Sequence, residues 1–188
     1  MENAELLQRV VDEANRVIDG VTPDQLDAQT PCDDWKVRDL LHHVVAGGQM
    51  FAIAAEDGSI PDDVLGQLMG SPLPDDYKSA FQASVTRAKT AFDAPGVDEK
   101  MMKLPFGDMP GAAVRSLITF DLATHTADLA RATGQSIADT EMTEAALALG
   151  RSVVGPEWRR PGSFAPERPV ADDAPAADRL LAFAGRSV

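Results

Sequence analysis

An aspartate and a histidine stand four residues apart in the segment FDLATHTADLA, at Asp121 and His125. Side chains at this spacing are neighbours on one face of an α-helix. The same face carries apolar residues at helical spacing, namely Val114, Leu117, Ile118, Leu122, Leu129 and Ala132. We therefore expect Asp121 and His125 to point toward the protein interior, where an isolated carboxylate is costly and needs a partner.

Two interpretations of this pair are open. The first is a salt bridge or hydrogen bond between Asp121 and His125, which is weak evidence for a role in stability. The second is a metal site, which requires a further ligand because one pair is a motif of low specificity. Another apolar helical segment offers His42 and His43. His43 lies beside its apolar stripe and has the small residue Gly47 one turn later, whereas His42 is expected to flank the stripe or to be exposed.

The depth of the two histidines in their segments agrees with a shared site. His43 lies about eight residues, or about 12 Å, from the start of its helix, and His125 lies equally far from the end of its own. If the two helices are antiparallel neighbours, His43 and His125 lie at the same height along them. Two imidazoles and one carboxylate suit Zn²⁺ with an open fourth position, and also Ni²⁺ or Fe²⁺. Cys32 is about 16 Å from His43 if the intervening chain is helical, so it is not counted as a ligand.

Helical patterns cover most of the chain and must position these side chains. They are expected at about 4–18, from 33–35 to just before Gly58, 75–92, 111–133, 141–154 and 178–183. A long connection at 56–74 separates the second and third segments, and the link at 100–111 has room for a short extended piece before Pro110. The pattern predicts an all-α four-helix bundle with one long crossover and additional C-terminal helices. We expect one domain over 1–188, in which 155–188 is an irregular extension that ends in a short helix.

The charge of the chain excludes several function classes. With 188 residues, a net charge of -13 and a pI near 4.5, the protein has no basic character for binding nucleic acid or an anionic membrane surface. No apolar run reaches the ~18 residues of a membrane-spanning helix, and the acidic N-terminal segment does not resemble a signal peptide. Cys32 is the single cysteine. These features predict a cytoplasmic protein.

Four stretches together resemble a known family, and the resemblance runs from about residue 8 to residue 186. They are TPCDDWKVRDLLHHVVAGGQMFA, LPFGDMPG, HTADLARATG and DDAPAADRLLAFAGR. The chain is similar to actinobacterial DinB-like metal-binding proteins related to the N-terminal domain of mycothiol-dependent maleylpyruvate isomerase. The resemblance implies a four-helix bundle with a crossover and a divalent metal between helices. It implies that His43, Asp121 and His125 are the metal ligands.

The chain also departs from that family. The isomerase has glutamate where this chain has Asp121, and such proteins often have tryptophan where this chain has Ala127. The isomerase carries a further C-terminal domain that helps to form its active site, so maleylpyruvate isomerisation is not expected here. The resemblance instead implies a metal-dependent S-transferase or detoxification enzyme, in which a thiol such as mycothiol or bacillithiol is activated to attack an electrophilic substrate.

Two further points stay open at this stage. Asp128 or Arg131 has a place from which to orient an imidazole or a substrate carboxylate, but an exposed Asp128–Arg131 pair is the favoured interpretation. The alternative function is a non-catalytic binding module. In that case a structural metal or the histidine–aspartate pair stabilises the bundle, and the acidic surface serves a partner protein or a homodimer.

Overall fold

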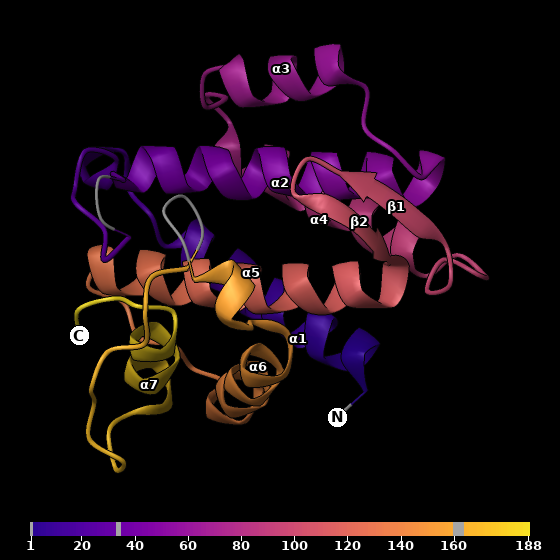
Figure 1. Cartoon of the computed structure of the whole chain (residues 1–188). Helices are drawn as coiled ribbons and strands as arrows, with labels where there is room; N and C mark the ends of the chain where they lie inside the picture. Colours follow the sequence, from indigo (N-terminus) through magenta and orange to yellow (C-terminus); the bar gives the residue numbers. More distant parts are fainter. Residues whose placement is uncertain (1, 33–34, 160–163) are drawn as a thin grey trace. The chain divides into compact units, whose positions relative to one another are not determined.

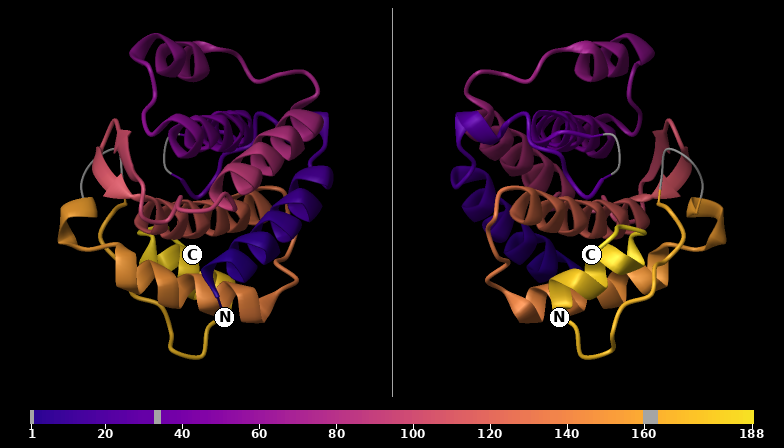
Figure 2. Two further views of the ribbon diagram at one scale, coloured as in Figure 1. Left: turned by 90° about the vertical axis from the view of Figure 1, so that its right-hand side faces the viewer. Right: turned by 90° about the vertical axis from the view of Figure 1, so that its left-hand side faces the viewer.

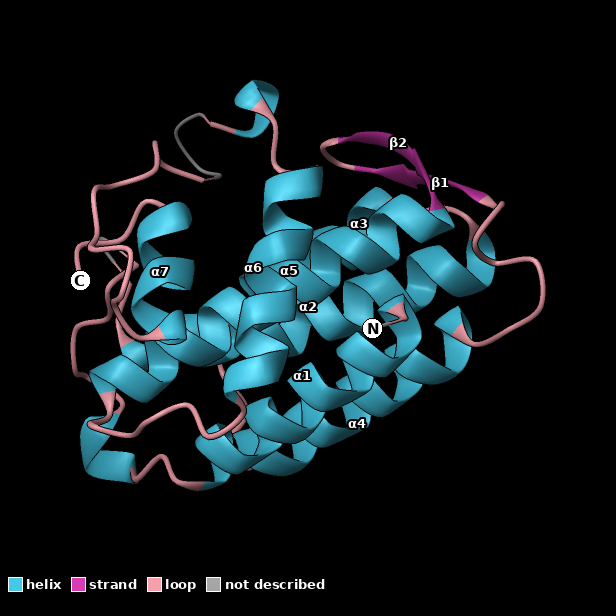
Figure 3. Ribbon diagram, turned by 90° about the horizontal axis from the view of Figure 1, so that it is seen from below, coloured by secondary structure: helices cyan, strands magenta, loops and turns pink. Residues whose placement is uncertain are grey.

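A computed structural model describes residues 2–32, 35–159 and 164–188. Within these ranges the chain forms seven α-helices and one two-stranded sheet (Figure 1 and Figure 3). The helices are α1 (Asn3–Asp19), α2 (Val37–Asp57), α3 (Asp62–Gly70), α4 (Tyr77–Phe92), α5 (Gly111–Ala132), α6 (Thr140–Val153) and α7 (Ala176–Phe183). The strands β1 (Met101–Leu104) and β2 (Gly107–Pro110) form an antiparallel hairpin. The predicted all-α fold class is confirmed.

Local sequence signals set most of the helix ends. Asp76 caps α4 by accepting a hydrogen bond from the backbone N–H of Ser79 at 3.1 Å. Asp139 caps α6 in the same way through the N–H of Met142 at 3.0 Å. Gly134 follows α5 with a φ of +70°, the left-handed conformation that glycine adopts readily. The observed bounds of α1, α4, α5 and α6 therefore lie within about two residues of the predicted ones.

Other segments differ from the prediction. The second helix begins at Val37 rather than at the predicted 33–35, and residues 33 and 34 lie outside the described residues. The long connection after α2 contains the additional helix α3, in which no residue is buried. Val64, Leu65, Leu68 and Met69 stand at helical spacing there, but the glycine, proline and aspartate residues of 56–74 favoured a connection. Residues 101–110 hold two strands, one more than the single extended piece expected.

The chain divides into two compact units. The terminal unit consists of residues 1–37 and 119–188, and the central unit consists of residues 38–118. The boundary falls within α5, so residues 111–118 of that helix belong to the central unit and 119–132 to the terminal unit. The prediction of a single domain stays a prediction.

In the central unit, an apolar cluster joins α2, α4, the hairpin and the first part of α5. Its buried members include Ala54, Phe92, Met102, Val114 and Ile118. Helices α2 and α4 approach closely at Gly48, where a Cβ atom would lie 2.6 Å from the hydroxyl of Ser84. This close approach requires glycine.

In the terminal unit, α6 contacts both α1 and α7 (Figure 2). The ring of Phe120 on α5 is fully buried and packs against Phe164 and Phe183, with centroid distances of 5.2 and 5.7 Å. A Cβ atom at Gly150 would lie 2.3 Å from the Phe120 ring. These contacts hold the C-terminal part of the chain against the segment of α5 that carries Asp121 and His125.

A membrane-spanning segment was not expected. Among the described residues, no helix has both the length and the apolar character needed to cross a membrane.

Candidate metal centre

Asp121 and His125 meet one turn apart on α5, in the terminal unit. The Nε2 atom of His125 lies 3.4 Å from Oδ1 of Asp121. The side chain of His125 is 6% exposed and that of Asp121 is 30% exposed. The helix therefore buries the imidazole and leaves one edge of the carboxylate accessible, which places two donor atoms together at the border of the core.

The other ring nitrogen of His125 contacts a second carboxylate. Nδ1 lies 3.1 Å from Oδ2 of Asp128, whose side chain is 0% exposed. The interpretation of Asp128 as an exposed partner of Arg131 is therefore wrong, and Arg131 instead pairs with Asp178 on α7. His125 and Arg131 each lie three residues from Asp128. Side chains at this spacing are neighbours on a helix, so the spacing alone does not choose between them.

A buried arginine from the C-terminal segment completes this cluster. Arg186 is 7% exposed, and its Nη2 and Nε atoms lie 3.3 and 3.4 Å from the carboxylate of Asp128. Its Nη1 donates to the carbonyl oxygen of Ala184 at 3.1 Å, and its Nη2 contacts the sulfur of Cys32 at 3.3 Å. The sequence analysis did not identify Arg186 as a functional residue, since nothing local marks an arginine 58 residues after its partner.

Cys32 and Trp35 also reach the cluster. The rings of Trp35 and His125 are stacked, with centroids 5.8 Å apart and an angle of 26°. The ligand atoms of Cys32, His125 and Asp128 all lie within 4.8 Å of one another, so they form a second candidate donor set. The guanidinium of Arg186 already contacts two members of this set. Because that positive charge disfavours an added cation, the side of the ring that faces Asp121 is the better metal position.

The two carboxylates set the charge state of the imidazole. Burial alone would lower the pKa of His125, but the negative charge of Asp121 and the hydrogen bonds with Asp121 and Asp128 raise it to about 9. In the metal-free protein the ring is therefore positively charged at neutral pH. The site favours a cation at this place, and a metal ion would have to displace the proton on Nε2.

The two other histidines belong to the central unit. His42 contacts the carbonyl oxygen of Leu68 on α3 through Nε2, at 3.1 Å. This contact gives His42 a structural partner of its own. His43 is partly buried on the same helix, α2. That His43 joins Asp121 and His125 stays a prediction.

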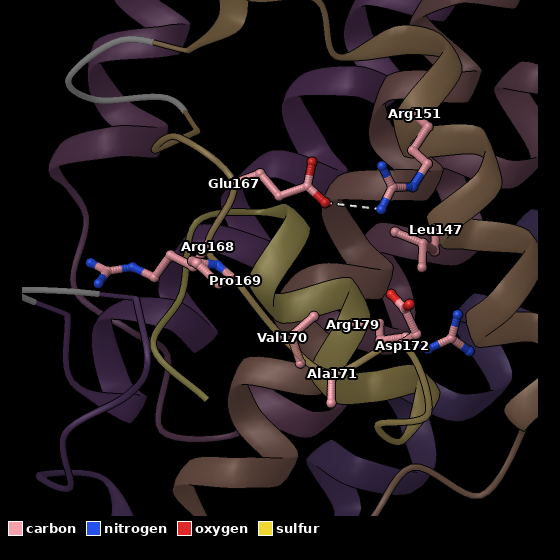
Figure 4. A pocket seen from close by; sticks show the side chains of 9 residues that line it. All are labelled: Leu147, Arg151, Glu167, Arg168, Pro169, Val170, Ala171, Asp172 and Arg179. Carbon is pink, nitrogen blue, oxygen red and sulfur yellow. Dashed lines mark hydrogen bonds and ion pairs between the residues drawn. The ribbon is translucent and has the colours of Figure 1, made fainter.

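A separate pocket of about 490 Å³ lies in the terminal unit between α6, α7 and residues 167–172 (Figure 4). Arg151 pairs with Glu167 across it at 2.9 Å, and Arg179 pairs with Glu144. Arg168 points away from the pocket (Figure 4) and donates to the carbonyl oxygen of Gly185. The arginines that line this pocket are thus engaged by other groups of the chain, and we assign it no ligand.

Comparisons with known proteins agree with the fold. The family model described as the mycothiol maleylpyruvate isomerase N-terminal domain matches residues 7–130. Two uncharacterized proteins of Mycobacterium tuberculosis, Rv0738 from strain H37Rv and MT0763 from strain CDC 1551, are each 39% identical over 188 residues. The match covers 96% of this chain and 96% of each relative.

Solved structures of mycothiol-dependent maleylpyruvate isomerase share the fold at low identity. The isomerase matches with a TM-score of 0.60 and a histidine-to-alanine mutant of it with 0.61, both at 14% identity. The match covers 78% of this chain and 66% of the isomerase chain, which is less than two thirds of its length. Because the family model matches well over half of the sequence, the chain belongs to the family of the mycothiol maleylpyruvate isomerase N-terminal domain.

Proposed function

We propose that the protein binds a divalent metal, zinc in the first place, through His43, Asp121 and His125, and uses it to transfer a small thiol to an electrophile. The observation that carries the proposal is the contact of 3.4 Å between Nε2 of His125 and Oδ1 of Asp121, at a ring whose other nitrogen already has a buried carboxylate partner. The donor set fits the metal, since two imidazoles and a carboxylate suit Zn²⁺ with an open position, and Ni²⁺ or Fe²⁺ as well.

The chemistry follows from that open position. A thiol coordinated to a bound zinc ion is deprotonated and becomes a nucleophile at neutral pH. His125 and Asp121 provide donor atoms, and the ring of Trp35 stacks on one face of the imidazole. In the transfer, the sulfur forms a bond to the electrophilic carbon, which gives up an electron pair to its leaving group or conjugated system, and the thiol proton passes to solvent.

The choice of thiol rests on the relatives. The family and the solved structures are named for their dependence on mycothiol, and we therefore propose mycothiol or a similar low-molecular-weight thiol as cosubstrate. We do not carry over maleylpyruvate as substrate, because the fold likeness is at 14% identity. A cytoplasmic location and a homodimer stay predictions.

Zinc titration of three histidine variants tests the metal site. We expect His43→Ala and His125→Ala to abolish stoichiometric zinc binding, measured by calorimetry and elemental analysis of untagged protein. His42→Ala is the matched control, since this histidine is adjacent in sequence but contacts Leu68. Equal loss in all three variants, or full binding in His43→Ala, would refute the ligand assignment.

A thiol-transfer assay then tests the activity. We expect the zinc-loaded protein to conjugate mycothiol to a model electrophile and the chelator-treated protein to lose this activity. Re-addition of zinc restores it if the metal acts in the reaction. Equal rates with and without metal would leave metal binding in place and refute metal-dependent transfer.

One observation favours a second candidate function, a non-catalytic binding module. The charges of the cluster are already paired, since His125 contacts Asp121 and Asp128, and Arg186 contacts Asp128. The cluster can therefore stabilise the fold by itself. This candidate predicts purified protein without bound metal and an unchanged melting temperature on addition of Zn²⁺ or Ni²⁺. A metal ion that binds the folded state would raise that temperature.

A further inference from the structure

We propose that Asp128 and Arg186 are positioning residues that fix the orientation and tautomer of His125, so that its Nε2 atom faces Asp121 and the metal. The inference deepens the proposed function and rests on it. It assigns a role to an arginine of the C-terminal segment, which lies beyond the part of the chain that the family model matches.

The contacts of the imidazole ring determine where its proton lies and how the ring is oriented. Asp128 accepts at Nδ1 at 3.1 Å, so the proton of a neutral imidazole belongs on Nδ1 and the lone pair on Nε2. Metal-binding histidines commonly donate their second ring N–H to a carboxylate, which fixes the tautomer and raises the basicity of the ligating nitrogen. Trp35 stacks on the ring and limits its rotation from a second direction.

The carboxylate of Asp128 is 0% exposed, and a buried carboxylate needs a counter-charge and hydrogen-bond donors. Arg186 supplies both, with two nitrogens within 3.4 Å of the carboxylate oxygens. An arginine is suited to this task because its planar guanidinium carries several donors in a fixed geometry.

Arg186 is itself held in place. The carbonyl oxygen of Ala184 accepts from its Nη1 at 3.1 Å. The residue between them, Gly185, has a φ of +89°, and a Cβ atom there would lie 2.5 Å from Cβ of Ala165. This glycine lets the chain turn so that Arg186 enters the interior. Gly185 thus allows Arg186 to enter the interior, Arg186 holds Asp128, and Asp128 holds His125.

An ordinary structural ion pair is the alternative, and two variants separate the two roles. Asp128→Asn keeps the size of the side chain but removes its charge, and Arg186→Met keeps the apolar stem but removes the donors. The matched controls are Asp178→Asn and Arg131→Met. They break the aspartate–arginine pair that joins α5 and α7.

Zinc affinity is the first readout. Loss of a carboxylate that orients a metal-binding histidine typically weakens metal binding by about 10–100-fold. We expect a weakening in this range for Asp128→Asn and a smaller one for Arg186→Met, with circular dichroism showing folded protein. The two controls should stay within about twofold of wild type, since exposed ion pairs contribute little.

The second readout is nitrogen-15 NMR of the imidazoles, which needs neither activity nor bound metal. The protein has three histidines, so their signals can be assigned by substitution. We expect a slowly exchanging Nδ1 proton on His125 in wild type and both controls, and its loss or a marked shift in Asp128→Asn. The wild-type spectrum also tests the inference if a variant fails to fold.

The outcomes distinguish the two proposals. Wild-type protein that binds no zinc refutes the metal site, and the positioning role is then judged from the His125 signal alone. Absence of that Nδ1 signal in wild type overturns the inference. It is equally overturned if both variants match their controls in zinc affinity while wild type binds zinc.

Discussion

Replacement of Glu13 by glutamine tests how much the buried carboxylate of Glu13 stabilises the packing of α1 against the segment between α5 and α6. Glu13 is 6% exposed and accepts a hydrogen bond from Arg16 at 2.7 Å and another from the backbone N–H of Ala138 at 2.6 Å. Burial alone would raise the pKa of Glu13, but these two hydrogen bonds outweigh it and hold the pKa below its ordinary value.

The magnitude follows from what each variant removes. Glu13→Gln keeps an amide oxygen for the N–H of Ala138 and loses the charge that faces Arg16. Since Arg16 is 43% exposed, solvent screening reduces the lost interaction below the usual range for hydrogen bonds to charged groups, to about 1 kcal/mol of unfolding free energy. Glu13→Ala also leaves the N–H of Ala138 without this acceptor, and we expect a cost of about 2–3 kcal/mol.

Urea unfolding at two pH values provides the assay. Because the folded-state pKa is lowered, the charge of Glu13 stabilises the fold above the unfolded pKa of about 4.5, and this contribution is lost as the pH falls through the folded pKa. The gap between wild type and Glu13→Gln should thus be present at about pH 7 and shrink below about pH 4. Glu5→Gln, at an exposed position of the same helix, is the control. A gap that is absent at neutral pH, or that persists in acid, would refute the reasoning.

Three further substitutions give simple outcomes. Cys32→Ser should leave zinc affinity within about twofold, and the cobalt-substituted wild-type protein should show no thiolate-to-metal absorption, because Arg186 occupies the cation position beside Cys32. Gly150→Ala should lower the unfolding free energy by about 1–3 kcal/mol in urea titrations, because its Cβ would lie 2.3 Å from the buried ring of Phe120. Asp139→Ala should cost about 1–2 kcal/mol in the same titrations, because it removes both the cap of α6 and the ion pair of Asp139 with Arg9.

For the first two of these substitutions, a specific contrary result would refute the reasoning. A large loss of zinc affinity in Cys32→Ser would mean that the metal lies on the other side of the imidazole, beside Cys32. For Gly150→Ala the control is Gly66→Ala in α3, where a Cβ meets no atom within 4 Å and the helix should gain stability. Equal effects of the two glycine substitutions would mean that the Phe120 contact does not limit the packing.

Local patterns predicted the helices well because their signals lie within a few residues of one another. Apolar residues at helical spacing predicted α4, α5 and α6 to within about two residues of their observed ends. The same logic correctly brought Asp121 and His125 into contact, since one turn of helix suffices for that. By contrast, α3 was missed because glycine, proline and aspartate residues surround its short apolar pattern, and no residue of it is buried.

The surroundings of His125 were not predictable from local patterns. His125 and Arg131 both lie three residues from Asp128, so spacing alone did not distinguish them and the wrong partner was favoured. The correct partner, Arg186, lies 58 residues further on. Cys32 was set aside through a helical distance to His43, but its sulfur lies beside Arg186. Each of these contacts depends on tertiary packing that no periodicity encodes.

The distance along the chain between Asp128 and Arg186 has a consequence for protein synthesis. At about 5–20 residues per second, the 58 residues that separate the carboxylate from its guanidinium take about 3–12 s to be made. During this interval the nascent α5 cannot bury Asp128 at low cost. We therefore expect the part of α5 around Asp128 to remain hydrated on the ribosome. It packs into the interior only after α7 and Arg186 have been synthesised.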